Sequence, residues 1–221
     1  MKLTLPAILL FIIVSMTSCF EIIEDVQVHQ NGSGTYKFIV NLSQSKNQID
    51  KIRTQDSILS YKVPTVAMAE SKITEVKNKL NAVEGISNVL ITQDHINYIY
   101  HLSCDFKNVA ALNTAMLSIW KTYDKKAPTN FKLYSFEEGV FTRNTNTNEL
   151  DHITQIANSQ IREMMQKSTY TIICRFDEPV SISNSMNYSL SPSKKATLYK
   201  NDVWSTLADQ GITNNTISIA K

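Results

Sequence analysis

The chain has 221 residues, of which 43% are hydrophobic and 19% charged, and this balance excludes both a disordered chain and a multi-pass membrane protein. Its 22 basic and 20 acidic side chains leave a net charge of +2, which provides no basic field for nucleic acid. The length fits one domain of generous size or two small ones in contact.

Residues 1–18 predict an export signal that ends at a cysteine. Lys2 gives a positive start, and Leu5–Val14 is an apolar run that is shorter than the roughly 20 residues needed to span a bilayer. The following Met16-Thr17-Ser18-Cys19 resembles the lipobox of bacterial lipoprotein signals. The resemblance implies that residues 1–18 are removed and that the Cys19 thiol takes a diacylglyceryl group, so that Cys19 becomes the acylated amino terminus. The alternative is an ordinary secretory signal with an incidental cysteine.

An acylated Cys19 predicts a membrane location. Each buried methylene contributes about 0.8 kcal/mol, so two or more acyl chains make a stable anchor. Phe20 follows the cysteine in place of the aspartate linked to inner-membrane retention, which favours the outer membrane. The acidic residues that follow are interrupted by Ile22 and Ile23, which favours the periplasmic face over the cell surface.

The segment after Cys19 has none of the Ser, Gly or Pro enrichment of a flexible tether. Strand-like sequence begins at Phe20 and continues to His29. We therefore expect the folded domain to be held within a residue or two of the membrane surface.

Hydrophobic patterning predicts one domain of mixed strands and helices over residues 19–221. A turn at Asn31–Gly34 joins the first two strands of a hairpin, because glycine adopts positive φ at low cost. Strands are expected over 20–29, 35–42, 86–93, 97–106, 131–136 and 169–176, and helices over 65–84, from 108 onward and over 148–167.

The order of these elements predicts the fold class. Residues 35–136 run strand, helix, strand, strand, helix, strand, which is the split βαβ order of ferredoxin-like folds. We therefore predict an α+β fold, a two-layer sandwich with a mostly antiparallel sheet and helices on one face.

Two further cysteines, Cys104 and Cys174, lie in strand-like runs of the exported part. An oxidising compartment allows a disulfide between neighbouring strands. Two buried free thiols are the alternative, because cysteine is among the most buried residue types. The sequence leaves both readings open.

The sequence contains no recognisable catalytic, cofactor or metal motif. His29, His95, His101 and His152 lack the spacing of zinc ligands, and no CxxC or GxSxG occurs. Glu137-Glu138 is a pair of carboxylates placed in a turn. We expect no catalytic residue, no cofactor and no metal site.

Several turns carry a family resemblance. The Asn31–Tyr36 hairpin, the Phe176–Pro179 turn and the Leu190–Leu198 segment, together with the lipobox cysteine, resemble uncharacterised envelope lipoproteins of the Bacteroidetes and, more distantly, LppM-type lipoprotein domains. The resemblance implies an envelope lipoprotein of unassigned activity and provides no catalytic residue.

We therefore expect a non-enzymatic protein that binds an envelope protein, a glycan or another envelope component. One form of this hypothesis is an apolar ligand held between helices and sheet. The alternative is an envelope hydrolase whose site is assembled from scattered residues.

Overall fold

A computed structural model describes residues 19–58, 61–123, 131–145, 157–209 and 211–220 of the chain. The predicted hairpin opens it. β1 (Glu21–Val28) pairs antiparallel with β2 (Gly34–Asn41) over its whole length. Gly34 is required in this hairpin, because a Cβ there would lie 1.8 Å from the carbonyl oxygen of Gln27.

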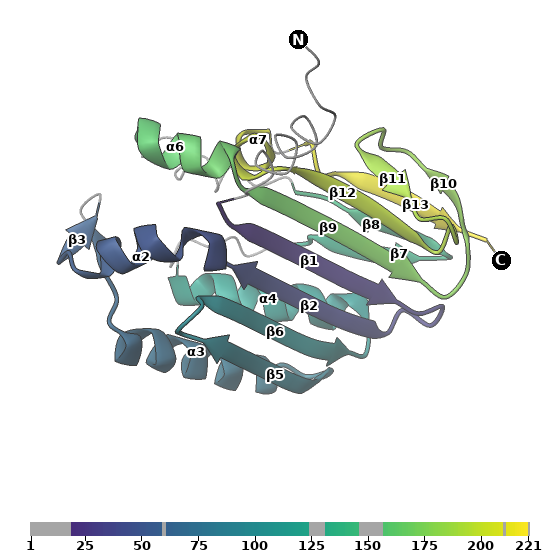
Figure 1. The fold of residues 1–221 in the computed structure, drawn as a ribbon. Coiled ribbons are helices and arrows are strands. Elements are labelled where there is room, and N and C mark those ends of the chain that lie inside the picture. Colours follow the sequence, from purple (N-terminus) through teal and green to yellow (C-terminus); the bar gives the residue numbers. More distant parts are fainter. Residues whose placement is uncertain (1–18, 59–60, 124–130, 146–156, 210, 221) are drawn as a thin grey trace, which may run out of the picture.

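The hairpin lies in the middle of a seven-stranded sheet, sheet A (Figure 1). β2 is followed on one side by β6 (Ile99–Phe106) and β5 (Ile86–Asp94), and β1 is followed on the other by β9 (Thr169–Phe176), β12 (Ala196–Asp202) and β11 (Tyr188–Leu190). β1 and β9 are parallel, and the other neighbouring pairs of this sheet are antiparallel. β1 is thus a central strand with a partner on each side.

Helices and a second sheet cover one face of sheet A (Figure 1). α3 (Val66–Asn81) and α4 (Val109–Tyr123) pack beside β5 and β6. The second sheet has the order β10-β13-β8-β7, with β7 at Tyr134–Glu137, β8 at Val140–Arg143, β10 at Val180–Ser183 and β13 at Asn215–Ile219. Side chains of both sheets and of α4 share one buried core, which includes Val26, Leu112, Phe141, Ile172 and Ile217.

Smaller elements complete the described chain: a 3-10 turn at Ser43–Ser45, α2 (Lys46–Arg53), β3 (Ser57–Ile58), β4 (Tyr61–Lys62), α6 (Ser159–Gln166) and α7 (Val203–Ala208). Asn158 caps α6, with its side chain accepting from the Ile161 N–H at 2.9 Å. The first part of the helix expected over 148–167 lies outside the described residues. Among the described residues, no helix has the length and hydropathy needed to cross a membrane.

The α+β class and the mostly antiparallel sheet are confirmed, but the ferredoxin-like order is wrong at its fourth strand. β2, β6 and β5 do stand in the interleaved order expected of a split βαβ unit. The strand after α4, β7, instead joins the second sheet, and β1 takes the place beside β2. A hairpin closed by a short turn forms this pairing at a lower loop-closure cost than a distant strand would.

The predicted two-layer sandwich with helices on one face is not confirmed. The layer opposite sheet A contains the four-stranded second sheet as well as α3 and α4. The short strands β7, β8, β10 and β13 bury Tyr134, Phe141, Val180 and Ile217 against sheet A. The second sheet therefore covers the part of this face of sheet A that α3 and α4 leave open.

Candidate functional site

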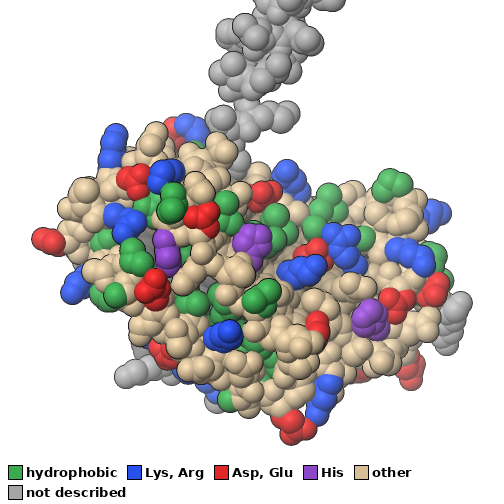
Figure 2. Space-filling model, turned by 60° about the horizontal axis from the view of Figure 1, so that its bottom comes forward, with side chains coloured by type: hydrophobic (Ala, Val, Ile, Leu, Met, Phe, Trp, Pro, Cys, Tyr) green, Lys and Arg blue, Asp and Glu red, His purple; other side chains and the backbone are tan. Residues whose placement is uncertain are grey.

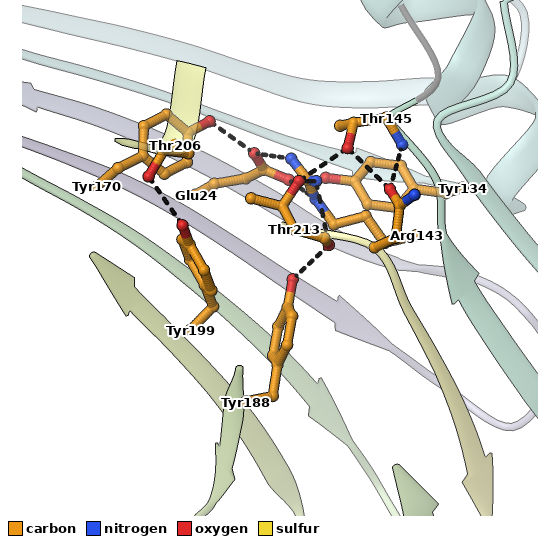
Figure 3. A network of polar contacts seen from close by, with 10 residues as sticks. Glu24, Tyr134, Arg143, Thr145, Tyr170, Tyr188, Tyr199, Thr206 and Thr213 are labelled. Atoms are coloured by element: carbon orange, nitrogen blue, oxygen red, sulfur yellow. Dashed lines mark hydrogen bonds and ion pairs between the residues drawn. The ribbon is translucent and has the colours of Figure 1, made fainter. Parts of the chain in front are cut away.

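The most unusual feature of the interior is an ion pair between the two sheets (Figure 3). Strand alternation places Glu24 on the same face of β1 as Val26 and Val28, and Glu24 is only 3% exposed. Its partner is Arg143, the last residue of β8, which is 4% exposed. Arg143 Nε lies 3.1 Å from Oε1 of Glu24, and Nη2 lies 3.1 Å from Oε2. The guanidinium thus binds the carboxylate with two parallel hydrogen bonds.

Tyrosine hydroxyls provide the other donors to this carboxylate (Figure 3). Tyr134 donates to Oε1 of Glu24, and Tyr170 donates to Oε2 at 2.9 Å. Each carboxylate oxygen therefore accepts two hydrogen bonds. On the opposite side of the guanidinium, Arg143 Nη1 donates to the Thr213 hydroxyl at 2.6 Å.

The electrostatics of the network keep Glu24 ionised. Burial raises the pKa of Glu24, but the charge of Arg143 and the donated hydrogen bonds lower it by more, so that the pKa lies below its ordinary value. Burial, reinforced by the Glu24 charge, raises the pKa of Tyr134 and Tyr170 well above the usual value. At neutral pH the tyrosines are therefore protonated donors to a carboxylate.

This arrangement is suited to holding the two sheets together and poorly suited to proton transfer. A general base needs a free lone pair and a pKa near the working pH, whereas the Glu24 oxygens are fully used and the pKa is lowered. The sequence analysis missed this site. The alternation along β1 indicates that Glu24 points inward with Val26 and Val28. Nothing in the local sequence identifies its partner, Arg143, which lies 119 positions away.

The predicted lipidation residue lies at one end of sheet A. The Cys19 backbone N–H donates to the Lys167 carbonyl at 3.0 Å, and the Ser45 hydroxyl donates to the Cys19 carbonyl. Phe20 N–H donates to the Ser168 hydroxyl at 3.2 Å. Cys19 is half-buried and lies between the beginning of α2 and the end of α6, and β1 begins two positions after it. Acylation of Cys19 stays a prediction, but the ordered strand expected directly after it is present.

The two other cysteines are free and buried, so the disulfide alternative is wrong. Cys104 on β6 and Cys174 on β9 occupy one cross-strand row, with Tyr36 of β2 and Val26 of β1 between them. Three strand spacings put them about 14 Å apart, whereas a disulfide requires Cα atoms within roughly 7 Å. Burial raises the pKa of Cys104 to about 11 and that of Cys174 to about 12, which makes both thiols unreactive.

Two of the described histidines have a carboxylate neighbour. His29 Nδ1 lies 2.9 Å from Asp177 Oδ1, and His95 Nε2 lies 3.6 Å from Glu70 Oε1. His101 is exposed on β6, and His152 lies outside the described residues. Within the described part of the chain, no three potential ligands gather into a metal site.

The carboxylates Glu137 and Glu138 are exposed at the turn from β7 to β8, and the turn gives Glu138 a φ of 52°. On the face shown in Figure 2, acidic and basic side chains are interspersed rather than gathered by sign. Neither feature adds a catalytic arrangement to the described residues.

Comparison with known proteins finds little that is similar. No protein-family model matches the chain, and no curated protein matches it. A solved structure that matches is the NMR structure of the folded domain of LppM from Mycobacterium tuberculosis. The TM-score is 0.43 at 7% sequence identity, and the match covers 92% of this chain and 91% of that one. An LppM lipoprotein domain is thus a structural neighbour of this chain.

Proposed function

We propose that this chain is a bacterial envelope lipoprotein, of the kind found in the Bacteroidetes, anchored through an acylated Cys19 and acting by binding an envelope partner. The observation that carries the proposal is the position of Cys19. It is half-buried, lies at the sheet end outside the core and directly precedes a central strand. A cysteine so placed can carry acyl chains into a membrane without disturbing the fold. The residue after it, Phe20, supports the outer membrane, and the interrupted acidic run supports its periplasmic leaflet.

The buried network holds the two sheets together and offers no group to a substrate. The network around Glu24 and Arg143 has its charges paired and its carboxylate oxygens occupied. The partner we expect is a protein or glycan of the envelope, because a domain without a tether meets components at the membrane surface.

One observation favours the alternative of an envelope hydrolase. His29 Nδ1 contacts the Asp177 carboxylate, and such a contact orients an imidazole so that Nε2 faces outward as a general base. The hydrogen bonds of the described residues place no hydroxyl or thiol on Nε2. If the chain is a hydrolase of this kind, the His29→Ala variant loses turnover of envelope esters or peptides, whereas His101→Ala keeps it.

The central experiment is metabolic labelling with palmitate. The Cys19→Ala variant should incorporate no label, because the acceptor thiol is gone, whereas Cys104→Ala should be labelled like the wild type. Undiminished labelling of Cys19→Ala would contradict the proposal. Membrane fractionation and protease treatment of intact cells then identify the membrane and the leaflet.

The partner is identified by crosslinking the protein in envelope extract, followed by mass spectrometry of proteins and lipids. A single specific protein or glycan supports the proposed role. A co-purifying lipid in its place would support the apolar-ligand form of the hypothesis.

A further inference from the structure

Three segments border the end of sheet A at which Cys19 lies (Figure 1). α2 begins beside the Cys19 carbonyl, and α6 ends beside the Cys19 N–H. The turn Asp94–Tyr98 joins the same edge, because Lys46 Nζ donates to the Ile96 carbonyl at 2.6 Å. We call Cys19, α2, α6 with its cap Lys167, and this turn the anchor edge.

The two helices of the anchor edge are amphipathic without being buried. All residues of α2 and α6 are described, and none of their side chains is buried. Each helix nevertheless carries apolar side chains on one side: Ile49 and Ile52 in α2, and Ile161, Met164 and Met165 in α6, all partly exposed. These apolar side chains are among the least exposed positions of each helix, as in a helix that packs on a globular domain, and only their open part is available to a bilayer.

The turn of the anchor edge presents an aliphatic side chain to the outside. Ile96 is 74% exposed. The turn is held in place, because the Asp94 carboxylate accepts the N–H groups of Ile96 and Asn97, both at 2.9 Å. Tyr98 follows with a φ of 57°, a conformation that is costly for a bulky residue.

Contacts with α2 stabilise this conformation of Tyr98. Tyr98 is 4% exposed, and Lys46 Nζ and Arg53 Cζ lie 5.2 Å and 5.7 Å from the centre of its ring. Its hydroxyl contacts Asp50. The exposed Ile96 is therefore displayed by a fixed turn.

We propose that the anchor edge lies on the bilayer, so that the strands of sheet A stand roughly along the membrane normal. This inference rests on the proposed acylation of Cys19. If acyl chains enter the bilayer at Cys19, no linker holds this edge away from it, because β1 begins at Glu21. The opposite ends of the strands, at the Asn31–Gly34 hairpin and the Ser191–Lys195 turn, are then about 26 Å further out, the length of an eight-residue strand.

The charges of the anchor edge fit an interfacial position. Basic side chains, whose apolar stems can lie along the bilayer while their charges reach the headgroups, outnumber acidic ones. The basic residues are Lys46, Lys51, Arg53, Arg162 and Lys167, and the acidic ones are Asp50, Asp94 and Glu163. With so small an excess, we expect anionic lipid to strengthen the contact only modestly.

The test attaches the chain that begins at Cys19, which contains every described element, to vesicles of phosphatidylethanolamine and phosphatidylglycerol through a maleimide lipid. Cys19 is the reactive thiol, because Cys104 and Cys174 are each 1% exposed with raised pKa values. A photo-crosslinking benzophenone residue replaces Ile96 or Lys51 on the anchor edge, or Ser193 at the opposite edge. All three positions are exposed.

We expect at least about tenfold more lipid adduct from Ile96 and Lys51 than from Ser193, since the two edges are about 26 Å apart. Equal yields at the three positions, or none above background, would overturn the proposal. If the Ile96 replacement disturbs folding, as judged by circular dichroism, Lys51 against Ser193 still decides the question. Chemical attachment does not depend on acylation in cells, so palmitate labelling tests the lipoprotein assignment separately.

Discussion

At the scale of single residues, the stabilising role of the buried network is tested at Glu24. The Glu24→Gln variant keeps the shape of the side chain but leaves the Arg143 guanidinium buried without a counter-charge. Removing one partner of a buried pair costs about 3–5 kcal/mol. We expect a loss of that size in the free energy of unfolding, measured by urea titration.

A matched control lies on the next residue of the same strand. Asp25 accepts from Arg175 Nε at 3.0 Å, but the Arg175 side chain is 47% exposed. Pairs of this kind contribute about 0–1 kcal/mol, so Asp25→Asn should be nearly neutral. If Glu24→Gln costs no more than Asp25→Asn, the network does not stabilise the fold.

The lowered pKa of Glu24 also predicts how stability depends on pH. The pKa is lower in the folded than in the unfolded chain, so the stabilisation is complete above the unfolded value of about 4.3. It is lost as pH falls through the folded pKa, because the folded carboxylate must then bind a proton. Urea titrations between neutral pH and pH ~3 should show this loss, and the slope should be shallower in Glu24→Gln. Equal slopes in the two proteins would assign the acid sensitivity to other carboxylates.

At the scale of single elements, β1 determines how the anchor connects to the fold. It pairs with β2 on one side and β9 on the other, and Cys19 and Phe20 are themselves hydrogen bonded. We expect residues 20–30 to resist limited proteolysis in the detergent-solubilised protein, which is monitored by mass spectrometry. Rapid cleavage there, with a stable remainder, would mean that the segment is a flexible tether, and the membrane-apposed arrangement would be abandoned.

α3 provides a second test of an element. The apolar stripe of this helix is buried at Val76 and Leu80, which are 7% and 0% exposed. Leu80→Asp places an unpaired charge in the core and should cost several kcal/mol, about 3–5 by analogy with other buried substitutions. Lys77→Asp, at an exposed position of the same helix, should change stability by less than about 1 kcal/mol. Similar midpoints for both variants in urea would show that the stripe does not pack.

The elements that the sequence predicts well are those with a complete local signal. The hairpin has its Asn31–Gly34 turn, and α3 has a sustained helical period, so both are found where expected. The second sheet has no such signal, because each pair of neighbouring strands has only three or four residue pairs in register and the strands come from three distant parts of the chain. Pairing of this kind depends on tertiary packing, which local patterns do not encode.

The same distinction applies to the candidate sites. Cys19 carries a local motif of four residues, which is enough to predict it as a lipidation site. Glu24 and Arg143 each look like ordinary charged residues in short strands, and only the fold brings them together. The His29 and Asp177 contact, 148 positions apart, was hidden for the same reason.

At the scale of the whole molecule, the two ends of the chain form one core. Residues 20–136 contain the hairpin, α3 and α4. In the structure, β1 also needs β9, and Glu24 needs Arg143, so a chain ending at Phe136 would leave a strand edge and a buried charge without partners. The cooperative unit must therefore reach the last strand, β13, whose Ile217 lies in the common core.

Two tryptophans allow this prediction to be measured. Trp120 lies in α4 and contacts Phe131, whereas Trp204 lies in α7 under the Arg162 guanidinium. The Trp204→Phe variant keeps Trp120 as its fluorescent probe, in the layer of helices. The Trp120→Phe variant keeps Trp204, beside the end of sheet A. Because both probes belong to one packed unit, we expect a single unfolding transition in each variant. Within a variant, the urea curves from fluorescence and from far-UV circular dichroism should have the same midpoint. Two transitions seen within a single variant, with fluorescence and circular dichroism changing at different urea concentrations, would divide residues 19–221 into separate domains. The Glu24 and Arg143 pair would then be an interface between them.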